Sequence, residues 1–349
     1  MPCYPDGMWS YLLLFSGTLI CSLLLTPLVR QQAIRRRVFD HPDLERRVHT
    51  APLPRLGGVA IYLALLLGCL VLVWLDHAWI SFWRLFLPVT LIFLLGVADD
   101  VFGIGERWKL VLPAFSATLL YALGYRLTSL SLGPNFSLAL PGWLGFVLLV
   151  IWLVGITNAF NLIDGADGLA AGVSLIVVSA VLAISILIGQ RESAFFAAML
   201  LGALSGFLPY NFYPASIFLG DSGSLLLGFL VAVLAIRGTG NPTGTVSIVA
   251  PIILGLPITE AAVTLLRRWH AGQPLLPGDR GHFHHKLLDR NLSQRQVVMR
   301  LYVASAIFAI SGLALLNASW GITILLLVLL GLAVIWGIRH LRYFEYERN

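Results

Sequence analysis

Residues 142–189 read GWLGFVLLVIWLVGITNAFNLIDGADGLAAGVSLIVVSAVLAISILIG, and this stretch decides the fold class. Its two apolar runs, 142–160 and 168–189, are each about 20 residues long, which is the length that a helix needs to cross the ~30 Å hydrocarbon core of a membrane. Two asparagines and two aspartates gather where the runs meet. The stretch therefore predicts two membrane-spanning helices joined by a polar turn.

The rest of the chain repeats this pattern. Of its 349 residues, 58% are hydrophobic and 11% are charged, and the mean hydropathy is +0.87, which excludes an ordinary soluble domain. We therefore predict an all-α integral membrane protein in which residues 1–349 form one polytopic bundle. About eleven apolar runs predict its transmembrane helices, and they lie at 9–29, 57–75, 84–98, 108–126, 142–160, 168–189, 194–211, 217–236, 246–266, 298–316 and 320–338. The third, fifth and ninth runs can be merged or split in other ways.

The basic residues predict the orientation of this bundle. Cytosolic loops are enriched in Lys and Arg, and 19 of the 23 Lys and Arg lie on one side, in or beside alternate loops or in the C-terminal tail. The N-terminus is therefore expected outside and the C-terminus in the cytosol. The predicted cytosolic loops are 30–56, 99–109, 158–168, 211–217 and 267–297.

The net charge of +6 does not indicate a nucleic-acid-binding protein. The charges lie at the predicted membrane edge, where they attract anionic lipid and phosphate groups, and no nucleic-acid-binding module is visible. The three cysteines, Cys3, Cys21 and Cys69, have no CxxC spacing. They predict neither a disulfide framework nor a zinc site.

Adjacent acids end the third apolar run. Asp99 and Asp100 lie on the predicted cytosolic side, where carboxylates next to hydrocarbon are costly and so are candidates for function. Adjacent carboxylates repel each other unless a cation or a proton lies between them, which suits a magnesium or phosphate site; the alternative is a solvated helix end. Lys109, in the same loop, could reach a phosphate, or it could be an ordinary basic flank.

Two further acidic clusters lie on the same side. Asp164 and Asp167 are three residues apart, which puts both carboxylates on one face if the turn is helical; the alternative is a plain Asp-Gly turn. Asp221 stands among glycines and serines at a helix start, where a carboxylate can face a metal while backbone N–H groups face a phosphate. The alternative for Asp221 is an N-cap.

The loop 279–286, Asp-Arg-Gly-His-Phe-His-His-Lys, is rich in histidine. It lacks the regular Cys or carboxylate spacing of zinc loops. Its cationic and imidazole groups are expected to bind a phosphate or sugar. Those groups are Arg280, His282, His284 and His285. The alternative is a charge patch at the membrane surface. Carboxylates for a divalent cation and basic groups for anions, on one membrane face, indicate phosphoryl transfer with a lipid partner.

In these ordered motifs the chain resembles the polyprenyl-phosphate N-acetylhexosamine-1-phosphate transferases of glycosyltransferase family 4, near the bacterial branch that acts on UDP-N-acetylglucosamine. The resemblance runs from Pro54-Arg55-Leu56-Gly57-Gly58 to the histidine loop. It implies a transferase that moves N-acetylglucosamine-1-phosphate from the UDP-sugar to undecaprenyl phosphate and releases UMP, as the first membrane step of cell-wall or surface polysaccharide synthesis. It also implies Mg²⁺ as the cofactor, with Mn²⁺ as an alternative, a homodimer, and a multi-pass protein of the inner (plasma) membrane with its site facing the cytoplasm.

The resemblance also implies roles for individual residues. Asp221 is expected to bind magnesium together with Asp164, and Asp99 is expected to activate the lipid phosphate with Asp100 beside it. Asn161, Asp164 and Asp167 are expected to act in metal or nucleotide binding, and Phe218 is expected to stack on uracil. We expect direct attack by the lipid phosphate rather than a covalent aspartyl intermediate.

Departures from the family pattern leave the sugar open. Phe283 interrupts the three consecutive histidines of the muramoyl-pentapeptide branch, and Gly103 stands where some relatives carry a further acid or base. Another UDP-N-acetylhexosamine is the alternative substrate. A secondary transporter is disfavoured because the acids lie at one edge rather than at the membrane midplane. A CDP-alcohol phosphotransferase is disfavoured because Asp164-Gly165 does not continue as DGxxAR.

Overall fold

The structure, a computed structural model, describes residues 8–40, 52–76, 79–133, 136–241, 244–273, 281–316, 318–341 and 343. Within these ranges, eight helices are long and apolar enough to cross a membrane, judged by length and composition. They are α1 (Met8–Arg35), α3 (Trp79–Phe102), α5 (Gly142–Ile163), α6 (Leu169–Leu187), α7 (Arg191–Asn211), α8 (Gly220–Thr239), α12 (Gln294–Leu315) and α13 (Trp320–His340). Two further apolar helices are α2 (Gly57–Asp76), of which the stretch Gly57–Val73 is apolar, and the shorter α4 (Trp108–Ala122). The prediction of an all-α polytopic membrane protein is confirmed.

The ninth predicted span, 246–266, is not one continuous helix. It consists of a strand, β5 (Thr245–Ser247), a short helix, α9 (Val249–Ile253), and a longer helix, α10 (Gly255–His270). Pro251 and Pro257 explain the break. A proline has no N–H group to donate within a helix and is best accommodated in a first turn. Pro257 lies in the first turn of α10. The expectation of eleven uninterrupted spans is therefore wrong at this run.

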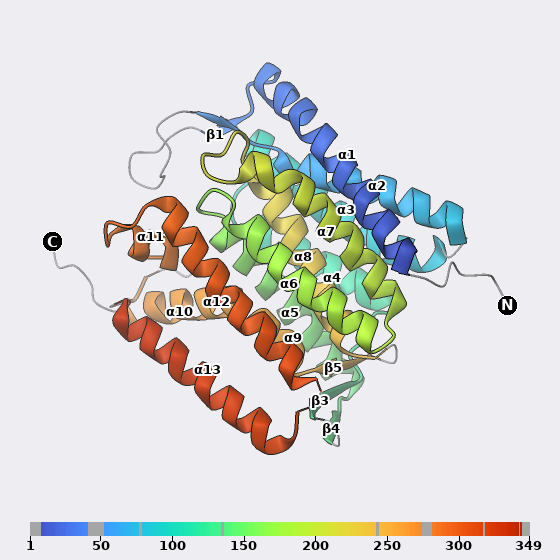
Figure 1. Cartoon of the computed structure of the whole chain (residues 1–349), viewed down its shortest axis with the longest axis vertical. Helices are drawn as coiled ribbons and strands as arrows, with labels where there is room; N and C mark the ends of the chain where they lie inside the picture. The colour runs from blue at the N-terminus through green and yellow to red at the C-terminus, as the bar shows by residue number, and fades with distance from the viewer. Residues whose placement is uncertain are drawn as a thin grey trace.

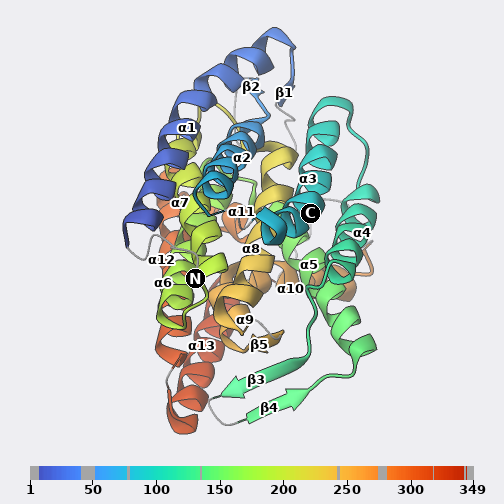
Figure 2. The same cartoon turned by 90° about the vertical axis from the view of Figure 1, so that its right-hand side faces the viewer.

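In the described part of the chain, five short strands lie in the connections between helices. β1 (Phe39–Asp40) pairs antiparallel with β2 (Leu53–Pro54). β3 (Ser129–Gly133) lies between β4 (Phe136–Ala139), which is antiparallel to it, and β5, which is parallel to it. In these loops, the strand pairs provide hydrogen-bond partners for backbone N–H and C=O groups that lie outside the helices. Figure 2 shows the pair β1–β2 and the sheet β3–β4 at opposite ends of the molecule.

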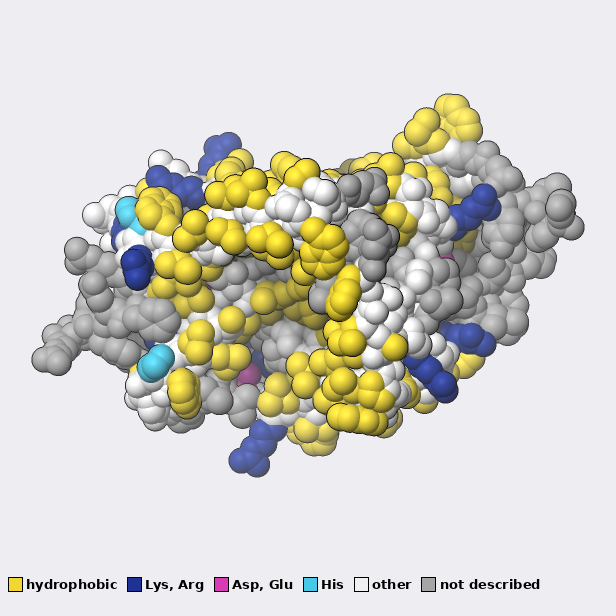
Figure 3. Space-filling model, turned by 90° about the horizontal axis from the view of Figure 1, so that it is seen from below, with side chains coloured by type: hydrophobic (Ala, Val, Ile, Leu, Met, Phe, Trp, Pro, Cys, Tyr) yellow, Lys and Arg dark blue, Asp and Glu magenta, His cyan; other side chains and the backbone are white. Residues whose placement is uncertain are grey.

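Helix α8 is the centre of the bundle. Of its most apolar stretch, 94% is buried, and it packs against α2, α3, α5 and α6 (Figure 1). By contrast, α13 lies at the outer edge, and only 6% of its most apolar stretch is buried. Figure 3 shows hydrophobic side chains over much of the surface on one face, as expected when lipid is the solvent.

Close helix packing fixes the start of α8. A Cβ atom on Gly58 of α2 would lie 2.2 Å from the backbone nitrogen of Gly223, and one on Gly96 of α3 would lie 2.4 Å from the carbonyl oxygen of Asp221. Small residues of this kind let helix backbones approach closely in membranes. The end of α3 and the start of α8 therefore meet at one end of the bundle, and contacts of Asp99 and Asp221 with Lys109 and Asn161 place the start of α4 and the end of α5 there as well. The acidic motifs lie there.

Candidate active site

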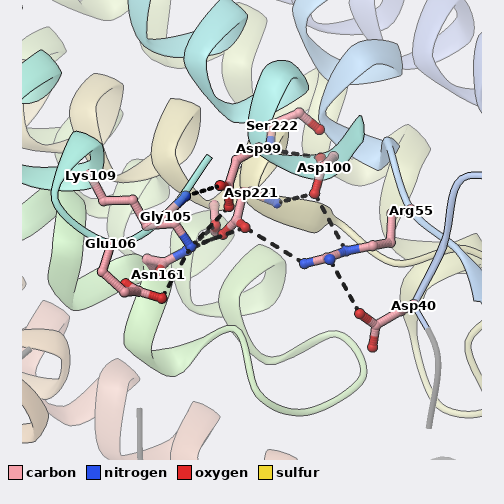
Figure 4. Close-up of polar contacts among 11 residues, drawn as sticks. Asp40, Arg55, Asp99, Asp100, Gly105, Glu106, Lys109, Asn161, Asp221 and Ser222 are labelled. Carbon is pink, nitrogen blue, oxygen red and sulfur yellow. Dashed lines mark hydrogen bonds and ion pairs between the residues drawn. The ribbon is translucent and has the colours of Figure 1, made fainter. Parts of the chain in front are cut away.

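Asp221, in the first turn of α8, is the centre of the polar cluster shown in Figure 4. The Lys109 amino group lies 3.2 Å from its Oδ2 and 3.0 Å from Oδ2 of Asp99. The Asn161 amide donates to Asp221 Oδ1 and also to the Ser224 hydroxyl at 3.0 Å. The structure thus brings together one cation and two carboxylates that come from α3, α4 and α8. All three side chains are largely buried.

The adjacent aspartates Asp99 and Asp100 face different partners. Asp99 faces Lys109 and also accepts from the backbone N–H of Gly105 at 3.3 Å. Asp100, whose side chain is fully buried, accepts from the backbone N–H groups of Asp221 and Ser222, both at 2.9 Å. Asp100 therefore caps α8 from another helix, where the helix dipole favours a negative charge.

Gly220 makes this cap geometrically possible. Its φ angle is +71°, and a Cβ atom there would lie 2.6 Å from Asp100 Oδ2. Only glycine adopts such a conformation without strain and leaves room for the carboxylate. The glycine before Asp221, which the sequence offered only as a small neighbour, thus sets the distance between the end of α3 and the start of α8.

Arg55 is the site residue to which sequence reasoning gave no role. Its guanidinium lies 3.4 Å from Asp100, 3.6 Å from Asp221 and 3.3 Å from Asp40. Burial acts to lower the pKa of Arg55, but the neighbouring carboxylates, Asp100 first, raise it above its ordinary value, so the side chain stays charged. The signal was present in the sequence as a single arginine just before Gly57-Gly58 at the start of an apolar run.

The backbone around Phe218 holds Arg55 in place. The N–H of Phe218 donates to the carbonyl of Pro54 at 2.9 Å, and the N–H of Gly57 donates to the carbonyl of Phe218 at 3.0 Å. Phe218 is half-buried beside the chain segment that carries Arg55. Its expected contact with uracil stays a prediction.

Asp164 and Asp167 do not share a face. Asp164 ends α5, and burial, followed by the negative charge of Asp221, raises its pKa well above the ordinary value. Asp164 therefore lies near the carboxylate cluster. Asp167 instead accepts from the backbone N–H of Ala215 at 2.9 Å and holds the loop before α8. A shared face was expected only if this segment were helical, and residues 164–168 form a turn instead.

The described part of the histidine loop contacts this turn. His284 is buried, and a Cβ atom on Gly165 would lie 2.3 Å from its Nε2, so the imidazole lies directly against the Gly165 backbone. His282 stacks on His284 with ring centroids 5.7 Å apart, and the ring of His285 lies 4.2 Å from that of His284. Burial, with the neighbouring histidines, holds the pKa of His284 well below its ordinary value, so this ring is neutral. Arg280 lies outside the described residues.

The carboxylates of this cluster are oxygen donors of the kind that a magnesium ion prefers. Within the described ranges, no group of three or more His, Cys, Asp or Glu side chains is already arranged around a metal position. However, Asp99 and Asp221 both contact one cation, the Lys109 amino group. Magnesium is usually held by one or two carboxylates together with substrate phosphates. Asp221 and the nearby Asp164 are the residues that would hold it, with Asp99 beside them.

Fold and site together define a polytopic membrane protein with a buried cluster of charged side chains at one end of its bundle. The family model for glycosyl transferase family 4 matches residues 82–239, which carry all five aspartates of the predicted site. The chain is 34% identical to the "Probable undecaprenyl-phosphate N-acetylglucosaminyl 1-phosphate transferase" of Bacillus subtilis, over 90% of this chain and 88% of the relative.

Two further relatives cover similar lengths. The chain is 31% identical to the "Undecaprenyl-phosphate alpha-N-acetylglucosaminyl 1-phosphate transferase" of Thermotoga maritima, over 84% of this chain and 88% of the relative. It is 28% identical to the "Phospho-N-acetylmuramoyl-pentapeptide-transferase" of Shouchella clausii, over 86% of this chain and 94% of the relative. The chain belongs to glycosyl transferase family 4, the family of polyprenyl-phosphate N-acetylhexosamine-1-phosphate transferases that its motifs indicated.

Proposed function

We propose that this enzyme transfers N-acetylglucosamine-1-phosphate from UDP-N-acetylglucosamine to undecaprenyl phosphate and releases UMP. Family membership and the names of the relatives from Bacillus subtilis and Thermotoga maritima support the reaction. The observation that carries it is the convergence of Asp99, Lys109, Asp221 and Arg55 at one end of an apolar bundle. Such a site holds anionic phosphates next to the hydrocarbon where the lipid tail must lie.

The bond changes follow from the two substrates. An oxygen of the lipid phosphate attacks the sugar-bearing β-phosphorus of the UDP-sugar. The bond from that phosphorus to the bridging oxygen breaks, and UMP leaves with the electron pair. The products are a polyprenyl-diphosphate sugar and UMP. If the lipid phosphate enters as its monoanion, Asp99 accepts its proton, which makes the phosphate a better nucleophile.

The cationic side chains orient the phosphates. Lys109 and Arg55 lie on two sides of Asp221 and can each turn from a carboxylate to a phosphate oxygen. Magnesium, when bound, would neutralise charge on the diphosphate and on the leaving UMP. Asp221 and Asp164 would hold it, and the Asn161 amide fixes the rotation of the Asp221 carboxylate. Asp100 acts by fixing the start of α8, on which Asp221 lies.

The site is proposed to face the cytoplasm across the inner (plasma) membrane. This orientation rests on the loops rich in Lys and Arg, of which 30–56 and 99–109 adjoin the site. A different N-acetylhexosamine is the second candidate substrate. The relative from Shouchella clausii supports this alternative, because it is named a phospho-N-acetylmuramoyl-pentapeptide-transferase and its match covers 86% of this chain.

A panel of donors tests the proposal. The purified chain in detergent with Mg²⁺ is given UDP-N-acetylglucosamine, UDP-N-acetylgalactosamine or UDP-N-acetylmuramoyl-pentapeptide, with and without undecaprenyl phosphate. UMP release that requires both the lipid and UDP-N-acetylglucosamine supports the proposal. Release with another donor only would replace the sugar, and release without lipid phosphate would exclude this transfer. Omitting divalent cations, or replacing Mg²⁺ with Mn²⁺, tests the cofactor.

A further inference from the structure

Glu260, on α10, is a buried carboxylate that the proposed reaction does not use. It is 2% exposed and lies within the run predicted as the ninth span. Its Oε1 lies 2.9 Å from His282 Nδ1, and both of its oxygens accept from the backbone N–H of Phe283 at 3.1 Å. An isolated buried carboxylate is costly. This one is satisfied by two residues of the histidine loop.

The hydrogen bond from His282 has a direct chemical consequence. Because a carboxylate accepts, His282 must carry its proton on Nδ1, which fixes both the tautomer and the plane of the ring. The Phe283 N–H belongs to the first residue of α11 (Phe283–Leu288), whose N-cap, His282, makes no side-chain cap of its own. Glu260 therefore fixes the imidazole and the start of the helix together.

From His282 the contacts lead back to the carboxylate cluster. The ring of His282 is nearly parallel to that of His284, with 6° between their planes. His284 in turn lies against Gly165, next to Asp164. A rotation of His282 would therefore displace the ring that contacts the turn carrying Asp164.

A residue after α13 completes the surroundings of Glu260. Tyr343 is 1% exposed, and its hydroxyl lies 3.0 Å from the Thr264 hydroxyl and 3.4 Å from Glu260 Oε1. Its ring meets the ring of Phe283 edge to face at 5.0 Å. Tyr343 thus covers the carboxylate and packs against the residue between the two stacked histidines.

We propose that Glu260 is a positioning residue, which holds His282 in its Nδ1–H tautomer and so keeps the histidine loop against the Asp164 turn. Its effect on rate rests on the proposed function. Removing the carboxylate that orients a metal-binding histidine typically costs about 10–100-fold in activity, and we expect a loss of that order for His282. The role predicts that Glu260 acts through His282 and not independently of it.

A double-mutant cycle tests this dependence. Glu260→Gln keeps the shape of the side chain but replaces one of the two acceptor oxygens with an NH2 donor, so one oxygen is left for His282 and Phe283. We expect it to lower the rate of UMP release by about 10–100-fold and to cost less than about threefold when His282→Gln is already present. Equal losses in both backgrounds would overturn the proposal. The control Glu192→Gln removes a carboxylate that contacts Tyr125 and Arg237, away from the site, and should leave the rate unchanged.

A spectroscopic measurement separates this proposal from the reaction itself. In ¹⁵N-histidine-labelled protein, nitrogen chemical shifts distinguish a proton on Nδ1 from one on Nε2. We expect one Nδ1–H signal to shift or to be lost in Glu260→Gln, to be lost in His282→Gln, and to be retained unchanged in Glu192→Gln. An unchanged histidine spectrum in a folded Glu260→Gln variant would exclude the positioning role. Absence of UMP release from the unaltered enzyme would instead reject the proposed function and leave the signal as the test of the contact.

Discussion

The amino group of Lys109 lies 3.2 Å from the carboxylate of Asp221, although 112 positions separate the two residues in the chain. The same amino group lies 3.0 Å from Asp99. One buried cation therefore balances two buried carboxylates at the position where a divalent cation would be expected. When magnesium binds beside Asp221, we therefore expect the Lys109 amino group to leave the carboxylates and to move toward a substrate phosphate.

Lys109→Met should lose activity and respond more strongly to magnesium. Without the amino group, Asp99 and Asp221 repel each other, which costs about 3–5 kcal/mol for a broken buried pair. UMP release should fall by about 10²–10³-fold. Thermal unfolding in detergent should show a larger stabilisation by Mg²⁺ than in the unaltered protein, since the ion replaces the missing charge. Arg107→Gln, an exposed neighbour, is the matched control, and an equal Mg²⁺ response in both variants would contradict the prediction.

Asp99→Asn and Asp100→Asn should fail in different ways. Asp100 accepts two backbone N–H groups of α8, so its amide variant should lower the free energy of unfolding by about 1–3 kcal/mol through a lost acceptor. Asp99 is the proposed base, so Asp99→Asn should lower the rate by about 10²–10⁴-fold with a smaller change in stability. Thermal unfolding and UMP release, measured on both variants, check this contrast. Equal loss of stability in the two variants would remove the distinction.

The membrane-spanning part of the fold was predictable from the sequence, because a backbone surrounded by lipid must satisfy its own hydrogen bonds. A helix satisfies its own backbone groups in hydrocarbon, so within the residues that the structure describes ten of the eleven predicted runs fall on single helices, and eight of these helices are long and apolar enough to cross a membrane. The ninth run failed because length does not detect the prolines and glycine that divide α9 from α10. The short strands lie in loops, where hydropathy carries no information.

The site was predictable as a set of residues but not as a set of contacts. The acids were found because carboxylates are costly near hydrocarbon, and the same reasoning would have marked Glu260, a lone acid in the ninth run. It could not separate Asp99 from Asp100, because the partner of Asp100 is the start of a helix more than a hundred residues later. Arg55 was given no role for the same reason, since two of its three carboxylate partners, Asp100 and Asp221, come from distant segments.

Gly165→Ala should displace the histidine loop. The added Cβ atom would lie 2.3 Å from His284 Nε2, so the imidazole must move. A displacement of about 1 Å in a catalytic arrangement can cost roughly a hundredfold in rate, and we expect a loss of UMP release of that order. Gly155→Ala in α5 is the matched control, because no atom lies within 4 Å of its added methyl group. Full activity in Gly165→Ala would show that contact between His284 and the turn does not matter for the reaction.

Asp164→Asn should make the protein more stable at neutral pH while it lowers activity. Burial and the charge of Asp221 raise the pKa of Asp164 well above 3.8. Between 3.8 and the raised pKa, the folded state keeps a proton that the unfolded chain has released, so stability falls as pH rises, by at most about 1.4 kcal/mol per pH unit. The amide variant lacks this penalty. In EDTA, its unfolding temperature should exceed that of the unaltered protein at roughly pH 8 by more than at roughly pH 5, and Mg²⁺ should narrow the gap because it binds the ionised carboxylate. A difference independent of pH would show that Asp164 is ionised without cost in the folded protein.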